Sequence, residues 1–335
     1  MSQVEAIADA VLYEGYLLYP YRRSAVKNQV RWTFGGVHPR EWSLATGGTE
    51  PWLQQTQCLV RAGDGSADAF PRGCRLDVTV RFLRLLECSR PGEPDWQEAT
   101  EYSRSAQDLD LESLLQRPVE LAIELAAGEP SSEAGQSDGV RRRFESLNAE
   151  VEIAAEEAAP GTVRVTVQVR NLTELPGAAD LDRERAMLHS MASTHAVLRV
   201  RGGEFVSLTD PPAPLTEAAG ACQNVGVWPV LVGEPGSRDT LLASPIILED
   251  HPQVAAESPT ELFDGTEIDE ILTLRILTLS DDEKRELREG DERGRRLLER
   301  TEALTADELM RLHGTLRNVR PLAGDRPDAG EVRGL

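Results

Sequence analysis

Residues 163–170 read VRVTVQVR and alternate strictly between valine and a polar side chain. Because successive side chains of a β-strand point to opposite faces, the four valines lie on one face and the polar side chains on the other. A turn at Pro160-Gly161 separates this run from another strand-like run at residues 150–154. The pattern predicts an antiparallel hairpin with one face in the core and one face in water.

Short runs of similar character recur along most of the chain. They are rich in β-branched and apolar residues and are separated by loops that contain glycine and proline. They span residues 56–60, 76–86, 118–126, 196–200, 205–208, 227–232 and 245–248. Because these runs fit hairpins better than alternating strands and helices, we predict a body that resembles an antiparallel β-sandwich.

The period of the apolar residues changes after Pro259. Thr266 or Asp264 can cap a helix whose first turn is acidic. Its apolar stripe contains Ile268, Ile271, Leu272 and Ile276. The capping boxes SDDE at residues 280–283 and TADE at residues 305–308 predict two further helices. The predicted fold class is therefore mainly β with an α C-terminus, in which about three C-terminal helices follow the sandwich-like body.

The length of 335 residues is about twice that of a typical domain, so the chain has room for several regions. Residues 128–139 read GEPSSEAGQSDG, a small, polar and acidic composition typical of a linker. The predicted regions are an N-terminal β region at 1–127, a flexible linker or long loop at 128–143, a sandwich-like region at 144–262, a helical arm at 263–317 and a disordered tail at 318–335. The alternative for 128–139 is a loop inside one sandwich, since strand-like runs lie on both sides.

Charge and apolar length exclude two classes of partner. The chain carries 57 acidic and 36 basic residues, a net charge of −21, which repels nucleic acid and anionic lipid. No run approaches the ~20 apolar residues of a membrane span, and the first residues lack the charged region of a secretory signal. The four cysteines never form a CxxC pair. We therefore expect a soluble, cytoplasmic protein with reduced thiols, without nucleic-acid binding or membrane insertion.

Motifs for catalysis and for phosphate binding are missing from the sequence, which contains no GxSxG, HExxH, GxGxxG or P-loop. His189 and His195 lie six residues apart, so on a strand both imidazoles point to one face. Together with the Cys222 thiol, and with His38, they could bind a metal ion. The alternative is that these are ordinary surface or core residues, and we predict no cofactor.

Two segments have the composition of protein-binding surfaces, in which tyrosine, tryptophan and arginine are the usual anchors. The first is the aromatic and basic segment at residues 13–34, with Tyr13, Tyr16, Tyr19, Tyr21, Arg22, Arg23 and Trp32. The second is the apolar stripe of the predicted helical arm, with Ile268, Ile271 and Leu272. Both features favour a protein partner, although an aromatic strand in a sheet or a helix folded onto the body would explain them equally.

Three stretches carry a resemblance to a known family: YEGYLLYPYRRSAVKNQVRWTFGGV at residues 13–37, NVGVWPVLVG at 224–233, and the stretch from SPIILEDHP to KREL at 244–287. They resemble an uncharacterised bacterial family associated with gene clusters for actinobacterial-type uptake nickel–iron hydrogenases. The resemblance implies an accessory role in assembling, maturing or docking the hydrogenase subunits, or in serving their electron path.

The sequence narrows that implied role. It lacks the cysteine pairs that an iron–sulfur carrier uses and the P-loop of a nickel-insertion GTPase. The expected function is therefore a non-enzymatic accessory or assembly protein, a scaffold or chaperone that acts through protein–protein contacts, with hydrogenase subunits as partners. The alternative is a metal-dependent enzyme or a metal-handling protein that uses His189, His195 and Cys222.

Overall fold

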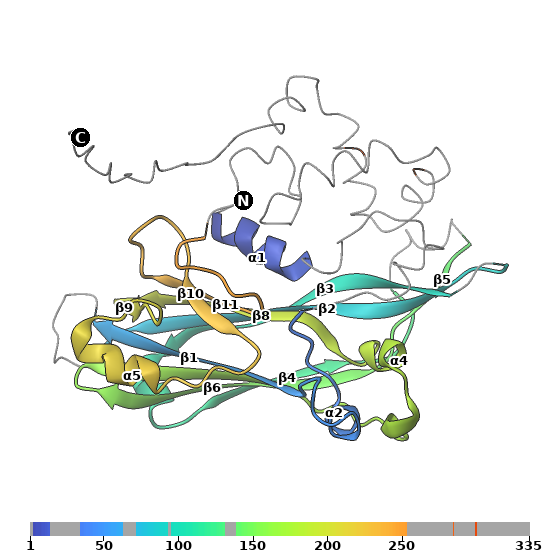
Figure 1. Cartoon of the computed structure of the whole chain (residues 1–335), viewed down its shortest axis with the longest axis horizontal. Helices are drawn as coiled ribbons and strands as arrows, with labels where there is room; N and C mark the ends of the chain where they lie inside the picture. Colours follow the sequence, from blue (N-terminus) through green and yellow to red (C-terminus); the bar gives the residue numbers. More distant parts are fainter. Residues whose placement is uncertain are drawn as a thin grey trace, which may run out of the picture.

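The structure is a computed structural model that describes residues 3–13, 34–62, 72–92, 95–130 and 139–252, together with Lys284 and Glu299. The described chain forms two antiparallel β-sheets that pack face to face (Figure 1). The predicted mainly β, antiparallel body is therefore confirmed. The predicted C-terminal helices and tail lie outside the described residues.

Sheet A has six strands. Five follow the order β10-β11-β8-β2-β3, and β5 pairs with one end of β2. The bounds are β2 (Arg75–Ser89), β3 (Trp96–Asp110), β5 (Arg141–Arg143), β8 (Met191–Arg201), β10 (Trp228–Leu231) and β11 (Thr240–Ser244).

Sheet B has five strands in the order β4-β6-β7-β1-β9. The bounds are β1 (Leu53–Ala62), β4 (Val119–Leu125), β6 (Leu147–Ala159), β7 (Thr162–Asn171) and β9 (Gly203–Val206). Both sheets contain strands from before and after the predicted linker at 128–143, since β1 pairs with β7 and β2 with β8.

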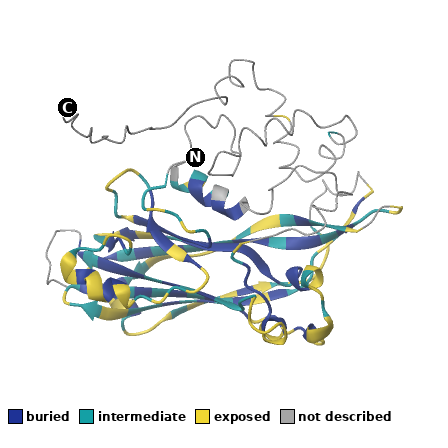
Figure 2. Cartoon of the chain, viewed as in Figure 1, coloured by how far each residue is buried: buried dark blue, intermediate teal, exposed yellow. Residues whose placement is uncertain are grey.

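The predicted hairpin is the pair β6 and β7, whose register places Val167 opposite Ile153. All four valines of the alternating run are buried, and the alternate positions of β7 are partly exposed. The turn contains Gly161 with a φ of 66°, a conformation that glycine adopts without steric cost. Burial is concentrated between the two sheets (Figure 2).

Short helices cover parts of the sandwich: α1 (Gln3–Tyr13), α2 (Arg40–Ala45), α3 (Leu111–Leu114), α4 (Arg183–Met187) and α5 (Thr216–Gly220), with 3₁₀ turns at Ala178–Asp180 and Ala213–Leu215. The amphipathic helix α1 lies on the outer face of sheet A (Figure 1), where Ile7 and Val11 pack against Val230 and Leu242. This contact buries a second apolar face of sheet A. Among the described helices, none is long and apolar enough to cross a membrane.

Two sequence predictions for the last strands are corrected. The run at 245–248 is not a strand; β11 ends at Ser244, directly before Pro245, which has no N–H to continue the pairing. The predicted runs at 196–200 and 205–208 are not one hairpin: the chain turns at Gly202 from β8 in sheet A to β9 in sheet B. The strand β3 is an element that the apolar patterns did not predict.

Candidate protein-binding surface

The three residues of the predicted metal site lie in different parts of the fold. His189 follows α4, and its Nδ1 lies 3.1 Å from the carbonyl oxygen of Ser146. His195 lies within β8 and is fully buried. Cys222 follows α5 and packs with a cluster on the outer side of sheet B. Across the ranges that the structure describes, no group of three or more His, Cys, Asp or Glu side chains is placed to hold a metal ion.

His195 belongs to the contact between sheet A and α1. Its Nδ1 lies 3.0 Å from the carbonyl oxygen of Ser193, while its Nε2 is buried without a hydrogen-bond partner. Burial, with a smaller contribution from the positive charge of Arg81 on the adjacent strand, lowers the pKa of His195 from 6.5 to about 4. Arg81 in turn donates to Oδ1 of Asp9 in α1 at 2.6 Å. The imidazole is therefore neutral at neutral pH and acts as part of the packing.

Burial also raises the pKa of the thiols of Cys222 and Cys58. In Cys222 a hydrogen bond with Arg164 opposes this effect without reversing it. Both groups are therefore protonated at neutral pH, whereas a thiolate is the form that attacks substrates and binds metals.

His38 is fully buried and belongs to a polar cluster that no sequence motif predicts. Its Nδ1 lies 3.0 Å from Oγ of Ser190, and its Nε2 lies 2.9 Å from Oε2 of Glu50. The His38 imidazole and the Arg183 guanidinium, which donates at 2.7 Å, lower the pKa of Glu50 to about 2. The composition resembles a Ser-His-Glu triad, but the Ser190 side chain is fully buried and donates to Ala186 O at 2.7 Å. These interactions connect the segments on either side of α2 to α4 and the residues that follow it.

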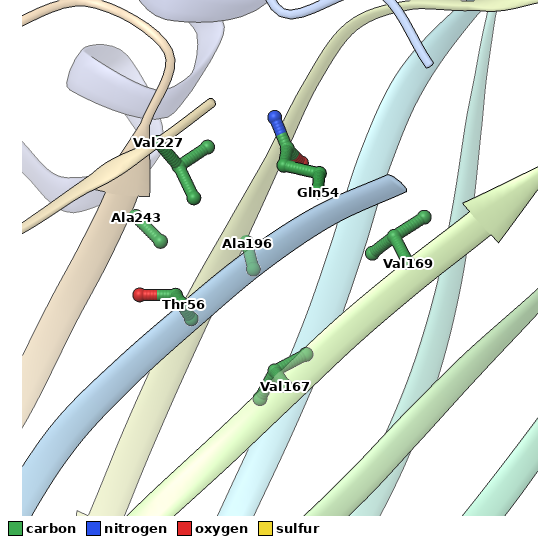
Figure 3. Close-up of a pocket in the computed structure, with 7 residues that line it drawn as sticks. All are labelled: Gln54, Thr56, Val167, Val169, Ala196, Val227 and Ala243. Atoms are coloured by element: carbon green, nitrogen blue, oxygen red, sulfur yellow. The ribbon is translucent and has the colours of Figure 1, made fainter. Parts of the chain in front are cut away.

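A small cavity lies between the two sheets, at the edge formed by β1 and by the loop that precedes β10. Side chains from β1, β7, β8 and β11 point into it (Figure 3). Its lining consists of Gln54, Thr56, Val167, Val169, Ala196, Val227 and Ala243. Its free volume is about that of one water molecule, far below the roughly 300 Å³ that a small-molecule site needs.

Polar side chains close this edge from within. Gln54 donates from Nε2 to the carbonyl oxygen of Thr194 at 2.9 Å and so links sheet B to sheet A. Thr56 donates from Oγ1 to Oδ1 of Asn224 at 3.1 Å. Gln55 and Val225 exchange two backbone hydrogen bonds of 3.0 and 2.8 Å. We call this edge the seam: it is the line along which Gln54, Gln55 and Thr56 form hydrogen bonds with Thr194, Val225 and Asn224.

Four large apolar side chains remain exposed around this seam, and we call them the rim. They are Phe34, Val225, Trp228 and Ile247, with exposed fractions of 46%, 43%, 44% and 73%. Exposed apolar groups that occur together, bordered by polar groups, are typical of protein-binding surfaces.

Backbone contacts bring the four rim residues to one end of the seam. Trp228 pairs with Ser244 at the end of β11, three residues before Ile247. The segment at 34–37 takes the place beside β8 that β11 leaves, since Thr194 N donates to Gly35 O at 2.9 Å. Gly35 has a φ of 61°, and a Cβ there would lie 2.6 Å from Cβ of Pro245. Glycine is therefore required where Phe34 approaches the end of β11.

The predicted binding segments lie almost entirely outside the residues that the structure describes. Tyr13 is the last residue of α1. The other predicted contact residues, Tyr16, Tyr19, Tyr21, Arg22, Arg23, Trp32, Ile268, Ile271 and Leu272, lie outside the described residues. Their roles stay predictions. The rim was missed because residues 227–232 read VWPVLV, a continuous apolar run, and no sequence signal distinguishes the exposed Trp228 from the buried Val230 on the same face.

Comparison with protein-family models, with curated proteins and with solved structures finds no match to this chain. The described fold and the rim define it as a two-sheet antiparallel β protein that exposes apolar side chains at one closed edge.

Proposed function

We propose that this protein binds other proteins in an accessory or assembly role and that hydrogenase subunits are its partners. The observation that carries the proposal is the rim, because exposed aromatic and aliphatic side chains are the groups whose burial drives protein association. Trp228 is the natural anchor, since tryptophan is among the residues most enriched at the energetic centres of interfaces.

The position of the rim in the sequence supports the choice of partner. All four rim residues fall within the three stretches that resemble the hydrogenase-associated family: Phe34 in 13–37, Val225 and Trp228 in 224–233, and Ile247 in 244–287. The hydrogen bonds that hold the seam together do not require large apolar side chains to be exposed to water at these four positions. A shared binding surface accounts for both their exposure and their place in the resemblance.

The test is affinity purification of the tagged full chain from its native host, with hydrogenase large and small subunits identified by mass spectrometry. Trp228→Ser removes the proposed anchor. Leu172→Ser is the matched control, because Leu172 is 47% exposed but lies outside the rim. We expect the wild type and Leu172→Ser to recover the subunits and Trp228→Ser to recover at least about tenfold less. Equal recovery by Trp228→Ser, or no hydrogenase subunit with the wild type, would contradict the proposal.

A further inference from the structure

The side of the sandwich opposite the seam ends in two consecutive strands, β3 in sheet A and β4 in sheet B. Among the described strands, β3 pairs only with β2 and β4 only with β6. An unpaired edge presents a row of backbone donors and acceptors to which another strand can add. This side therefore differs from the rim, because it offers backbone groups as well as side chains.

The register shows which groups of β4 point outward. Asn148 of β6 accepts from Leu172 N at 2.8 Å and donates to Oγ1 of Thr173, so its backbone points away from β4. Asn148 lies opposite Glu124, which is therefore a pair without mutual hydrogen bonds. Because the pattern alternates, the N–H and C=O groups of Glu120, Ala122 and Glu124 all point to the free edge.

The side chains of β4 follow the same alternation. Glu120, Ala122 and Glu124 are exposed on the outer face of sheet B. Val119, Leu121 and Leu125 lie on the inner face, half-buried against the core. A strand added to β4 would therefore meet apolar groups on one face and carboxylates on the other.

The carboxylates of this edge exceed the cations near them. Across the strand pair, Glu120 lies opposite Glu152. Arg170 of β7 pairs with Glu152 and also with Glu150, at 2.7 Å. Within the described part of the chain no cation pairs with Glu120 or Glu124. A strand with cations opposite these two positions would be favoured, since opposite charges on facing strands attract.

A second copy of this chain fits the edge poorly. Two β4 strands that overlap completely in an antiparallel, twofold-symmetric register centred on Ala122 would place Glu120 opposite Glu124 twice. Like charges directly opposite each other destabilise a strand pair.

From the free edge, the half-buried inner face and the unpaired carboxylates, we infer that β4 binds an extended segment of a partner protein in which basic and apolar residues alternate. The segment adds as a sixth strand of sheet B, with its apolar side chains over Val119 and Leu121 and its basic side chains beside Glu120 and Glu124. This inference rests on the proposed function, since it names the kind of segment that the protein partner contributes.

The probe is a blocked seven-residue peptide in which valine alternates with lysine, the length of β4. A peptide with glutamate in place of lysine is its control. We expect the lysine peptide to bind the full-length chain at least about tenfold more tightly than the glutamate peptide, and to weaken as salt screens the carboxylates.

Ala122→Pro tests the backbone contact. It removes one outward N–H and leaves the bonds to β6, and proline is tolerated where the N–H of an edge strand faces solvent. Ala122→Thr is the matched control that keeps the N–H. We expect Ala122→Pro to weaken binding of the lysine peptide about tenfold and Ala122→Thr to change it by less than about twofold.

Hydrogen exchange of the wild type provides a test that needs no variant. The lysine peptide should protect the amides of Glu120, Ala122 and Glu124, whereas those of Leu121 and Ile123 already bond to β6. Equal binding of both peptides, equal binding by Ala122→Pro, or no new protection would overturn the inference. So would a wild-type dimer that Ala122→Pro converts to a monomer, because the edge would then bind a second copy.

The two proposals can fail separately. If hydrogenase subunits are recovered but the lysine peptide does not bind, the proposed function stands and the β4 inference is wrong. If the peptide binds β4 but the native host yields no hydrogenase subunit, the partner assignment is wrong and the chemistry of the edge stands.

Discussion

The two sides of the sandwich treat their strand edges differently. On the seam side every edge has a backbone partner from a loop: Phe205 of β9 donates to Arg238 O at 2.7 Å, Leu231 of β10 accepts from His251 N at 2.7 Å, and Gln55 of β1 bonds Val225. On the opposite side, β4 has no such partner among the described residues. Within the described ranges, the seam-side edges therefore have backbone hydrogen-bond partners, whereas β4 pairs only with β6.

The two sides of the sandwich can therefore bind partners in different ways. Where loops satisfy the backbone, only side chains remain for recognition, and the seam side exposes the rim. Where the backbone is unpaired, main-chain hydrogen bonds supply affinity and alternating side chains supply specificity. Natural proteins usually protect open edges, because such edges otherwise pair indiscriminately. The carboxylates of β4 provide that protection against like-charged strands while leaving a basic strand admissible.

The largest predicted effect on the free energy of unfolding arises at His195, on the face of sheet A that α1 covers. Because this effect depends on pH, the two sides of the sandwich should be compared at neutral pH. Between its ordinary pKa of 6.5 and its native pKa of about 4, the unfolded chain binds a proton that the native chain does not. The contribution of the neutral His195 to the free energy of unfolding should therefore be fully present above pH 6.5. The free energy of unfolding should fall by up to about 3 kcal/mol as the pH drops towards 4. Urea unfolding across this range measures the loss.

His195→Asn supplies the control, because asparagine keeps a donor near the position of Nδ1 without a group that titrates here. A loss of equal size in this variant would assign the pH dependence to other groups. The lowered pKa of Glu50 acts in a separate range, from 4.5 down to about 2, where its stabilising contribution is lost on acidification.

A pair of proline substitutions tests the comparison of the edges directly. Val225→Pro removes the N–H that donates to Gln55 O at 2.8 Å on the finished side. It should lower the free energy of unfolding by about 2 to 3 kcal/mol. Ala122→Pro on the open side should cost less than about 1 kcal/mol, since no backbone bond is lost. Urea unfolding at neutral pH compares them, and equal costs would mean that the two edges do not differ.

Asp250 provides a smaller test of how the seam side is finished. Its carboxylate accepts from Ser207 Oγ at 2.5 Å, from Thr209 Oγ1 at 2.9 Å and from Leu231 N at 2.8 Å. Asp250→Ala leaves these donors unpaired and should lower the free energy of unfolding by about 2 kcal/mol. Glu124→Ala, the open-side counterpart, should change it by less than about 0.5 kcal/mol. Thermal unfolding of both variants decides whether loop closure contributes to stability.

A small effect on stability is also expected at the rim. Trp228→Ser alters a side chain that is 44% exposed and should change the free energy of unfolding by less than about 1 kcal/mol, even as it removes binding. A large loss of stability would show that the tryptophan is needed for folding, and reduced recovery of partners could then not be assigned to the surface. Denaturant unfolding should therefore precede every binding measurement with this variant.

The contrast between the sides also explains which strands the sequence could reveal. The run 163–169 was predictable because β7 has one buried and one wet face, and so was most of β4. The strand β3, with the sequence WQEATEYSRSAQDLD, gave no signal because much of it is exposed on both faces. Because neither face of β3 is consistently buried, its sequence carries no alternation, whereas the half-buried edge strand β4 keeps one.

The candidate binding surface could be recognised only from the folded structure. The rim joins residues from positions 34, 225, 228 and 247, and the His38 cluster joins residues from positions 38, 50, 183 and 190. Neither set has a local spacing that a sequence motif could capture. The metal hypothesis assumed that His189 and His195 share a strand, but β8 begins at Met191 and leaves His189 outside it.

The pairing of β1 with β7 has a consequence for how the protein comes into being. About 100 residues separate the end of β1 from the start of β7. At a synthesis rate of about 5 to 20 residues per second, β1 emerges from the ribosome roughly 5 to 20 s before its partner. During that interval β1 is synthesised without β7 or β9, the two strands with which it pairs. The nascent chain therefore exposes strand edges that the folded sandwich pairs.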